Sequence, residues 1–235
     1  MLKVVGSLLA SAVFLLVMNL LLALKHAPAS VEQKYFESIH GGFGIKDIYR
    51  QRGGADALAL YEKLLDGASS RIWAITNRRF VNSHFYRLEP ALNCSVSIKI
   101  KIVFADPSFE VSWAGGRDTG INLQMRLEQQ APPETKWKQY FEDGPLETLR
   151  QLPSGANVGD LEVMILRSIC FSTCFVIDDD VFFFPMLAGV DSGQDPTIHV
   201  GAHSVLGRCV IKHMECIFHS SEYCELIYSN KNPAP

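Results

Sequence analysis

Three consecutive aspartates, Asp178 to Asp180, stand between two apolar runs, and this arrangement constrains the fold more than any other part of the sequence. The runs are STCFVI over 172–177 and VFFF over 181–184. Short apolar runs bounded by turn residues are typical of buried strands, and aspartate favours tight turns. The segment therefore predicts two consecutive strands inside a sheet, joined by a turn made of aspartates.

The rest of the chain alternates between the two kinds of periodicity. Segments whose apolar residues recur with a helical period are predicted as helices: 55–68, 78–92, 121–130, 135–152 and most of 205–228. Strand patterns cover 71–76, 96–105, 161–167 and 197–201. A glycine-rich loop is expected over 113–120. Strands interleaved with helices in this way predict an α/β fold, a mixed β-sheet flanked by helices on both faces.

Residues 4–24 form an uncharged apolar run between Lys3 and Lys25. As a helix this run spans about 30 Å, the thickness of a bilayer's hydrocarbon core. A cleavable signal peptide has a shorter apolar stretch, of about 7–15 residues, although the segment 27–29 resembles a cleavage site. We expect an uncleaved, single-pass membrane anchor over 1–25. A linker over 26–41, a folded domain over 42–228 and a tail over 229–235 follow it. Lysines on both sides of the run leave the side of the membrane open.

Composition narrows the classes of function. Of the 235 residues, 48% are apolar and 20% are charged, as in an ordinary globular chain. A net charge of −3 provides no basic surface for nucleic acid, so no nucleic-acid partner is expected. The glycines at 41, 42 and 44 complete neither a dinucleotide nor a Walker pattern, and we expect no cofactor. Six cysteines are too few for a disulfide scaffold in a chain of this length.

Three segments of the chain are best considered together: GIKDIYRQRGGADALALYEKLLDGASSRIWAIT, SIKIKIVFADP and STCFVIDDDVFFFPMLAG. Together they resemble one lobe of a phospholipase D-like domain. The resemblance covers roughly residues 42–228, and an anchor followed by one lobe also resembles the mitochondrial single-lobe member of the superfamily. It implies a phospholipase D-like lobe. It also implies a homodimer as partner, because active members bring two catalytic segments together from two lobes or from two copies.

The catalytic segment of that family reads His-x-Lys-x-x-x-x-Asp. Aligned on Asp178, the histidine position holds Phe171 and the lysine position holds Thr173. In the family, histidines serve as nucleophile and general acid, and lysines neutralise charge on the phosphoryl oxygens. Side chains i and i+2 share one face of a strand, yet none of the seven histidines is followed two residues later by lysine. Only a histidine and a lysine from distant parts of the chain, converging beside the aspartates, would restore such a site.

The aspartates are the remaining candidates for ligand binding. Asp106, Asp178, Asp179 and Asp180 carry the oxygen ligands that a divalent cation prefers. However, neighbouring carboxylates on a strand alternate between its faces, and turns between strands commonly use aspartate. We therefore favour a turn and predict no metal site. If Asp106 lies at the same sheet edge as the other three, a metal site gains support.

Cys209, His213 and Cys216 fall on one face of a predicted helix. Zinc accepts these ligand types. Free cysteine is among the most buried residue types in proteins. We therefore expect this face of the helix to pack in the core.

Three hypotheses about function follow. The first is a membrane-anchored, catalytically inactive phospholipase D-like domain that acts as a binding, sensing or scaffolding module. Its surviving cleft would hold a phosphorylated or nucleotide-like ligand, an expectation that comes from the resemblance alone. The second is a divergent phosphodiesterase or metal-dependent hydrolase that uses Asp178 to Asp180. The third is a structural subunit of a membrane complex.

Overall fold

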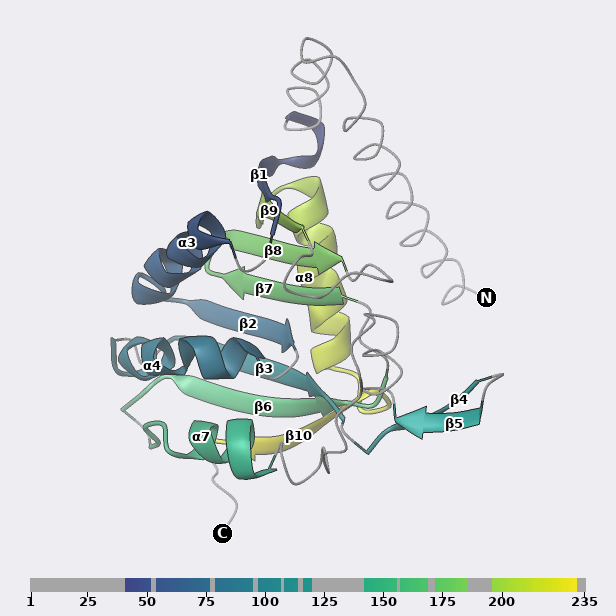
Figure 1. The fold of residues 1–235 in the computed structure, drawn as a ribbon. Helices are drawn as coiled ribbons and strands as arrows, with labels where there is room; N and C mark the ends of the chain where they lie inside the picture. The colour runs from purple at the N-terminus through teal and green to yellow at the C-terminus, as the bar shows by residue number, and fades with distance from the viewer. Residues whose placement is uncertain are drawn as a thin grey trace. The chain divides into compact units, whose positions relative to one another are not determined.

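Eight strands form one mixed sheet, in the order β1-β9-β8-β7-β2-β3-β6-β10 (Figure 1). Their bounds are β1 Ile45–Tyr49, β2 Arg71–Thr76, β3 Lys99–Ala105, β6 Asp160–Leu166, β7 Ser172–Ile177, β8 Asp180–Pro185, β9 Thr197–Gly201 and β10 Cys224–Ser229. The computed structural model describes residues 41–51, 54–76, 79–94, 97–106, 108–113, 116–119, 142–155, 157–168, 172–185 and 196–231.

Strands β2, β3 and β6 run parallel to one another, and every other pairing in this sheet is antiparallel. The mixed sheet predicted from the sequence is therefore confirmed. Strands β7 and β8 pair from Ser172 opposite Pro185 to Ile177 opposite Asp180. Asp178 and Asp179 form the turn between them, as the sequence predicts.

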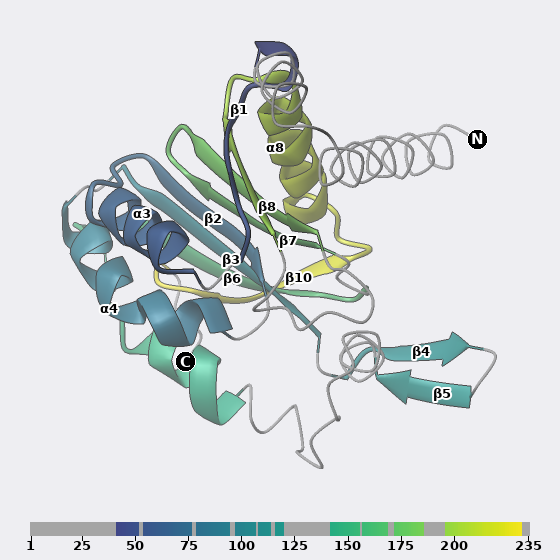
Figure 2. The same cartoon turned by 45° about the horizontal axis from the view of Figure 1, so that its top comes forward.

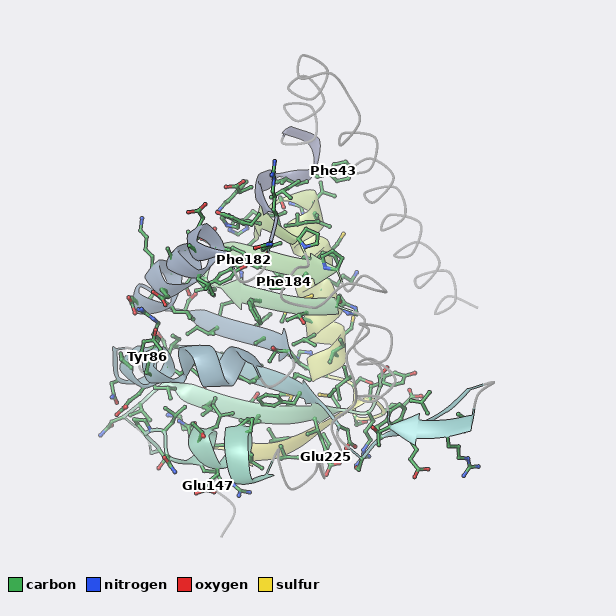
Figure 3. The ribbon with its side chains drawn as sticks, in the orientation of Figure 1. Phe43, Tyr86, Glu147, Phe182, Phe184 and Glu225 are labelled. Atoms are coloured by element: carbon green, nitrogen blue, oxygen red, sulfur yellow. The ribbon has the colours of Figure 1, made fainter. Side chains whose placement is uncertain are left out.

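Helices cover both faces of the sheet, which also confirms the prediction (Figure 2). Helices α3 (Ala55–Asp66), α4 (Arg79–Cys94) and α7 (Glu147–Arg150) pack with one face into the main core. Helix α8 (Val205–Phe218) lies on the other face, against β8 and β9. The α3 side contains an aromatic cluster: Phe182 and Phe184 of β8 are almost fully buried (Figure 3), and the ring of Tyr61 meets Phe182 edge-on at 4.7 Å. Burying each such ring contributes about 1.5–3 kcal/mol.

A second, separate sheet contains only β4 (Glu110–Trp113) and β5 (Gly116–Thr119). The two strands are antiparallel, with Glu110 opposite Thr119 and Trp113 opposite Gly116. The glycine-rich loop predicted over 113–120 was therefore wrong for residues 116–119. Such short strands carry too few apolar residues to show alternation, and the glycines mask the remaining signal.

Strand β10 was predicted as part of a long helix over 205–228, and that prediction was wrong. Helix α8 ends at Phe218, and β10 pairs antiparallel with β6 along the edge of the sheet. Short apolar runs do not distinguish a strand from a buried helical turn by periodicity alone.

Within the helix predicted over 135–152, a π-helical turn, η1 (Glu142–Leu146), leads directly into α7. The helix predicted over 121–130, and residues 135–141 of the next, lie outside the described residues.

The predicted membrane anchor over 4–24 also lies outside the described residues. Among the described segments, no helix combines the length and the apolar character that crossing a bilayer requires.

Candidate functional site

Asp178 joins the β7–β8 turn to the start of β2. Its carboxylate accepts hydrogen bonds from the backbone N–H groups of Ser69, Ser70 and Arg71, each at 2.9 Å. The hydroxyl groups of Ser69 and Ser70 donate to the same carboxylate at 3.3 and 2.6 Å. Arg71 also donates from Nε to the Asp178 carbonyl at 2.9 Å. Five donors thus converge on one carboxylate.

These donors also set the charge state of Asp178. Burial by itself raises the pKa of the Asp178 carboxyl. The hydrogen bonds from the Ser70 hydroxyl and from the backbone N–H groups of Arg71, Ser69 and Ser70 outweigh that effect and lower the pKa from 3.8 to about 2. A carboxylate offers about four lone-pair positions, and the protein's own donors occupy them. Asp178 is therefore a structural clamp and is poorly suited to hold a metal ion.

Thr173 stands at the position where the family pattern has lysine. It lies on β7 opposite Phe184 and is only 2% exposed. Its neighbours on the same face, Phe175 and Ile177, belong to the main core. This position is therefore filled by packing. Phe171, at the histidine position, lies outside the described residues.

A histidine and a lysine from distant parts of the chain do meet beside Asp180. His199 Nε2 lies 2.6 Å from Asp180 Oδ1, and Lys46 Nζ lies 2.5 Å from the same oxygen. The three residues come from the neighbouring strands β9, β8 and β1. Phe182 stacks on the His199 ring, with ring centroids 4.5 Å apart. We call Lys46, Asp180 and His199 the edge cluster, because β1 is one of the two edge strands of this sheet.

The edge cluster has a defined charge pattern. The pKa of His199 is lowered, because the effect of burial exceeds the opposite effect of the nearby Asp180 carboxylate. For Asp180, burial raises the pKa, but the hydrogen bonds from Lys46 and His199 outweigh burial, so the pKa of Asp180 is also lowered. Near neutral pH, Asp180 is therefore ionised and Lys46 balances its charge. A neutral His199 donates its Nε2–H to Asp180.

A carboxylate that fixes an imidazole, with an ammonium group beside it, has the components of an acid–base site. Two features limit that chemistry here. The His199 residue is only 6% exposed, and Phe182 covers one face of its ring. Among the described residues, no group of three or more histidine, cysteine, aspartate or glutamate side chains is arranged to hold a metal ion.

The structure does not bring Asp106 to the other aspartates. Asp106 follows the last residue of β3, whereas Asp178 contacts Arg71, the first residue of β2. Because β2 and β3 are parallel and paired from their first residues, the two carboxylates lie at opposite ends of the sheet, roughly 20 Å apart along the strands. Asp106 accepts hydrogen bonds from the Ser108 backbone at 2.8 Å and the Ser108 hydroxyl at 2.6 Å, as in a turn.

Asp179 lies 3.4 Å from His203, and both side chains are exposed.

The helix face with Cys209, His213 and Cys216 was predicted to be buried, and this was wrong. All three residues are exposed, and the buried residues of α8 are Gly207, Val210 and Met214. Gly207 packs directly against the carbonyl group of Gly201. This close approach sets the rotation of the helix, so residues three and seven positions after Gly207 face the sheet.

Comparisons with known proteins leave the family open. No protein-family model matches the chain, and no curated protein matches it. Similar solved structures include TrmBL2, an archaeal chromatin protein (13% identity, 93% of this chain and 68% of that one, TM-score 0.41). They also include the phosphatidylserine synthase of Haemophilus influenzae Rd KW20 (9% identity, covering 76% of this chain and 38% of that one, TM-score 0.43). A third is the polyphosphate kinase of Porphyromonas gingivalis (11% identity, covering 74% of this chain and 23% of that one, TM-score 0.34). Each TM-score is below 0.5, so these likenesses do not decide a family.

Proposed function

We propose that this chain is a membrane-anchored phospholipase D-like lobe that acts as a binding or scaffolding module without the phosphoryl-transfer chemistry of that family. The proposal rests on the burial and the contacts of Thr173 and Asp178, the two positions of the family pattern that lie among the described residues. Thr173 is buried in the core, and five protein donors occupy the Asp178 carboxylate. Neither side chain is placed to act on a phosphate ester.

The experiment is a phosphodiesterase assay on the purified full-length chain in detergent, with bis(p-nitrophenyl) phosphate as substrate. The proposal predicts no turnover above that of a heat-denatured sample. Turnover by the folded chain, reduced at least about tenfold by His199→Gln, would reject it. Circular dichroism of both proteins shows whether the variant still folds.

A divergent phosphodiesterase remains the second candidate, and the edge cluster favours it. His199 and Lys46 meet at Asp180 from strands far apart in the sequence, which is the convergence that such chemistry requires. In this alternative, Asp180 orients His199 as general base, and Lys46 stabilises negative charge on the substrate. Loss of turnover in both His199→Gln and Lys46→Met, with turnover kept in the exposed α4 variant Glu89→Gln, would establish this candidate.

The membrane anchor is tested separately. Residues 4–24 are long enough to span a bilayer as a helix, so the full-length chain should stay in the membrane fraction after alkaline carbonate extraction. A variant without residues 4–24 should be released. Release of both proteins would contradict the anchor and would leave the proposal for the folded domain intact.

A further inference from the structure

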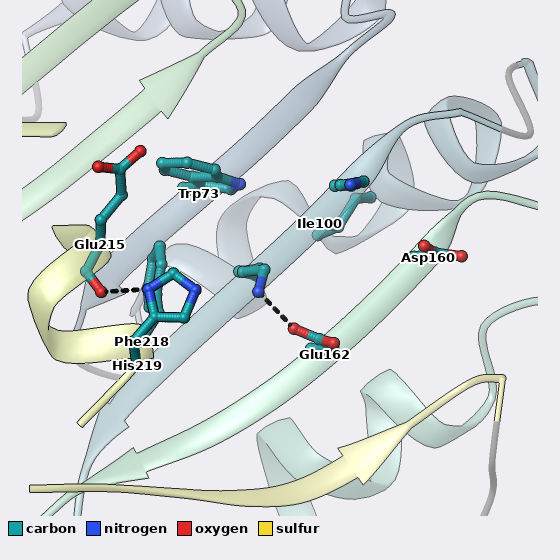
Figure 4. Close-up of a pocket in the computed structure, with 9 residues that line it drawn as sticks. Trp73, Ile100, Asp160, Glu162, Glu215, Phe218 and His219 are labelled. Atoms are coloured by element: carbon teal, nitrogen blue, oxygen red, sulfur yellow. Dashed lines mark hydrogen bonds and ion pairs between the residues drawn. The ribbon is translucent and has the colours of Figure 1, made fainter. Parts of the chain in front are cut away.

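A cavity of about 260 Å³ lies where the last turn of α8 meets strands β2, β3 and β6 (Figure 4). The side chains used below are Trp73, Lys99, Lys101, Glu162, Glu215 and Phe218, which all line it. Trp73 points away from its neighbours Ile72 and Ala74, which belong to the core on the α3 side. The cavity and the edge cluster are therefore on opposite faces of the sheet.

The aromatic part of this cavity is already ordered. Trp73 and Phe218 meet edge-on, with ring centroids 5.3 Å apart. The Lys101 ammonium group lies 5.6 Å from the Phe218 ring centroid and 2.7 Å from the Glu162 carboxylate. Lys101 and Glu162 therefore neutralise each other's charge. The rings of Trp73 and Phe218 form an apolar surface beside this ion pair.

Two charged side chains of the lining have no such partner. Within the described part of the chain, neither the Lys99 ammonium group nor the Glu215 carboxylate forms an ion pair. Asp160, the in-register neighbour of Lys99, pairs with Lys231 at 3.3 Å. The 2.8 Å hydrogen bond between His219 Nδ1 and Glu215 goes to the Glu215 backbone carbonyl and does not involve the Glu215 carboxylate.

These two charges mark opposite ends of the cavity. In Figure 4, Glu215 lies on one side of Trp73, and Asp160 and Glu162 lie on the other. Lys99 is on the Asp160 side, because the two residues are paired in the sheet. The carboxyl end of α8 adds partial negative charge near Glu215. One end of the cavity is therefore negative, and the end at Lys99 is positive.

The indole nitrogen of Trp73 supplies a second, independent observation. Nε1 is a buried donor without a hydrogen-bond partner among the described residues, and such a donor is unfavourable until an acceptor reaches it. Figure 4 shows this nitrogen on the side of the ring away from Glu215. This nitrogen lies at the same end of the cavity as the Lys99 ammonium group, and because it is buried, the indole ring must turn slightly toward the cavity before a ligand acceptor reaches it.

We propose that this cavity binds a small zwitterion of the free amino acid class. Its carboxylate lies toward Lys99 and Trp73 Nε1, and its ammonium group lies toward Glu215 and the end of α8. Its apolar side chain rests against Trp73 and Phe218. This arrangement pairs both unused charges and the unsatisfied indole donor at once.

The test uses the full-length chain with Trp113→Phe and Trp137→Phe, so that Trp73 is the only tryptophan that fluoresces. L-Leucine and L-phenylalanine are the probes. We expect a saturable change in Trp73 fluorescence at micromolar to millimolar concentration. Leucine amide lacks the carboxylate and N-acetyl-leucine lacks the ammonium group, and each should bind at least about tenfold more weakly than leucine.

Lys99→Met and Glu215→Gln should each weaken binding of leucine at least about tenfold. Both side chains are exposed, so the variants should fold, and Glu89→Gln on α4 should bind leucine normally. Absence of saturable binding of either amino acid would overturn the proposal. So would leucine amide binding as well as leucine, because that result identifies a cation site.

Discussion

Asp178 holds three backbone N–H groups and two hydroxyl groups with one carboxylate. We predict that Asp178→Asn lowers the free energy of unfolding at pH 7 by about 2–4 kcal/mol, because the new amide NH₂ faces donors that lose their acceptor. Asparagine tolerates the positive φ of 47° at this position at least as well as aspartate. The loss therefore reports the carboxylate rather than the backbone. Urea denaturation of both proteins measures it.

The same pair of proteins should also differ in pH dependence. The pKa of Asp178 is about 2 in the folded chain, below the ordinary value of 3.8. The unfolded chain therefore binds the proton first as the pH falls. The difference in the free energy of unfolding between the wild-type chain and Asp178→Asn is therefore largest above pH 3.8, and it should shrink between pH 3.8 and about 2. A difference that stays constant across that window would contradict the clamp.

His199 should give the chain a second pH dependence at higher pH. Burial lowers its pKa below the ordinary value of 6.5. The unfolded chain therefore takes up a proton on His199 before the folded chain does, and the free energy of unfolding should fall as the pH drops below 6.5. His199→Gln keeps an N–H donor for Asp180 but does not titrate. The slope between pH 7 and 5 should be smaller in this variant, as measured by urea denaturation at each pH. Equal slopes would show that His199 does not titrate differently in the two states.

At the scale of elements, Gly207 decides how α8 sits on the sheet. A Cβ atom there would lie 2.1 Å from the carbonyl oxygen of Gly201, a backbone atom that cannot rotate away. We predict that Gly207→Ala destabilises the fold by about 3 kcal/mol, because α8 must move off β9. Thermal unfolding followed by circular dichroism should show a Tm lower by roughly 6–12 °C. Gly67→Ala is the matched control: its Cβ would meet its nearest neighbour at 3.6 Å and should leave the Tm nearly unchanged.

Elements whose signal is local could be predicted from the sequence. Strands β2, β7 and β9 have the predicted bounds, because each is a short run between turn or polar residues. Strand β1 was not predicted, since its place depends on pairing with β9, about 150 positions later. The edge cluster has the same origin: Lys46 and Asp180 are 134 positions apart. No local pattern signals that contact. Thr173 and Asp178 could be located by motif alignment, but their burial and donors required the packed sheet.

At the scale of the whole molecule, residues just after 228 take part in the packing of the sheet. Strand β10 runs to Ser229, and Asn230 is fully buried. The Asn230 side chain accepts a hydrogen bond from Leu161 N at 2.8 Å and donates to the carbonyls of Pro153 and Gly159 at 3.0 Å. These bonds tie the residue after β10 to β6 and to the loop before β6.

We therefore expect a fragment of residues 42–231 to be more stable than a fragment of residues 42–228. The shorter fragment loses the three side-chain hydrogen bonds of Asn230, worth about 1 kcal/mol each, and also its backbone hydrogen bonds with Leu161 and Gly155. Its Tm should be lower by roughly 6–12 °C. Asn230→Ala in the longer fragment should reproduce the part of the loss that comes from the side chain, because it removes the three side-chain bonds without shortening β10. If both fragments melt together, the sheet does not depend on Asn230, and the domain ends at β10.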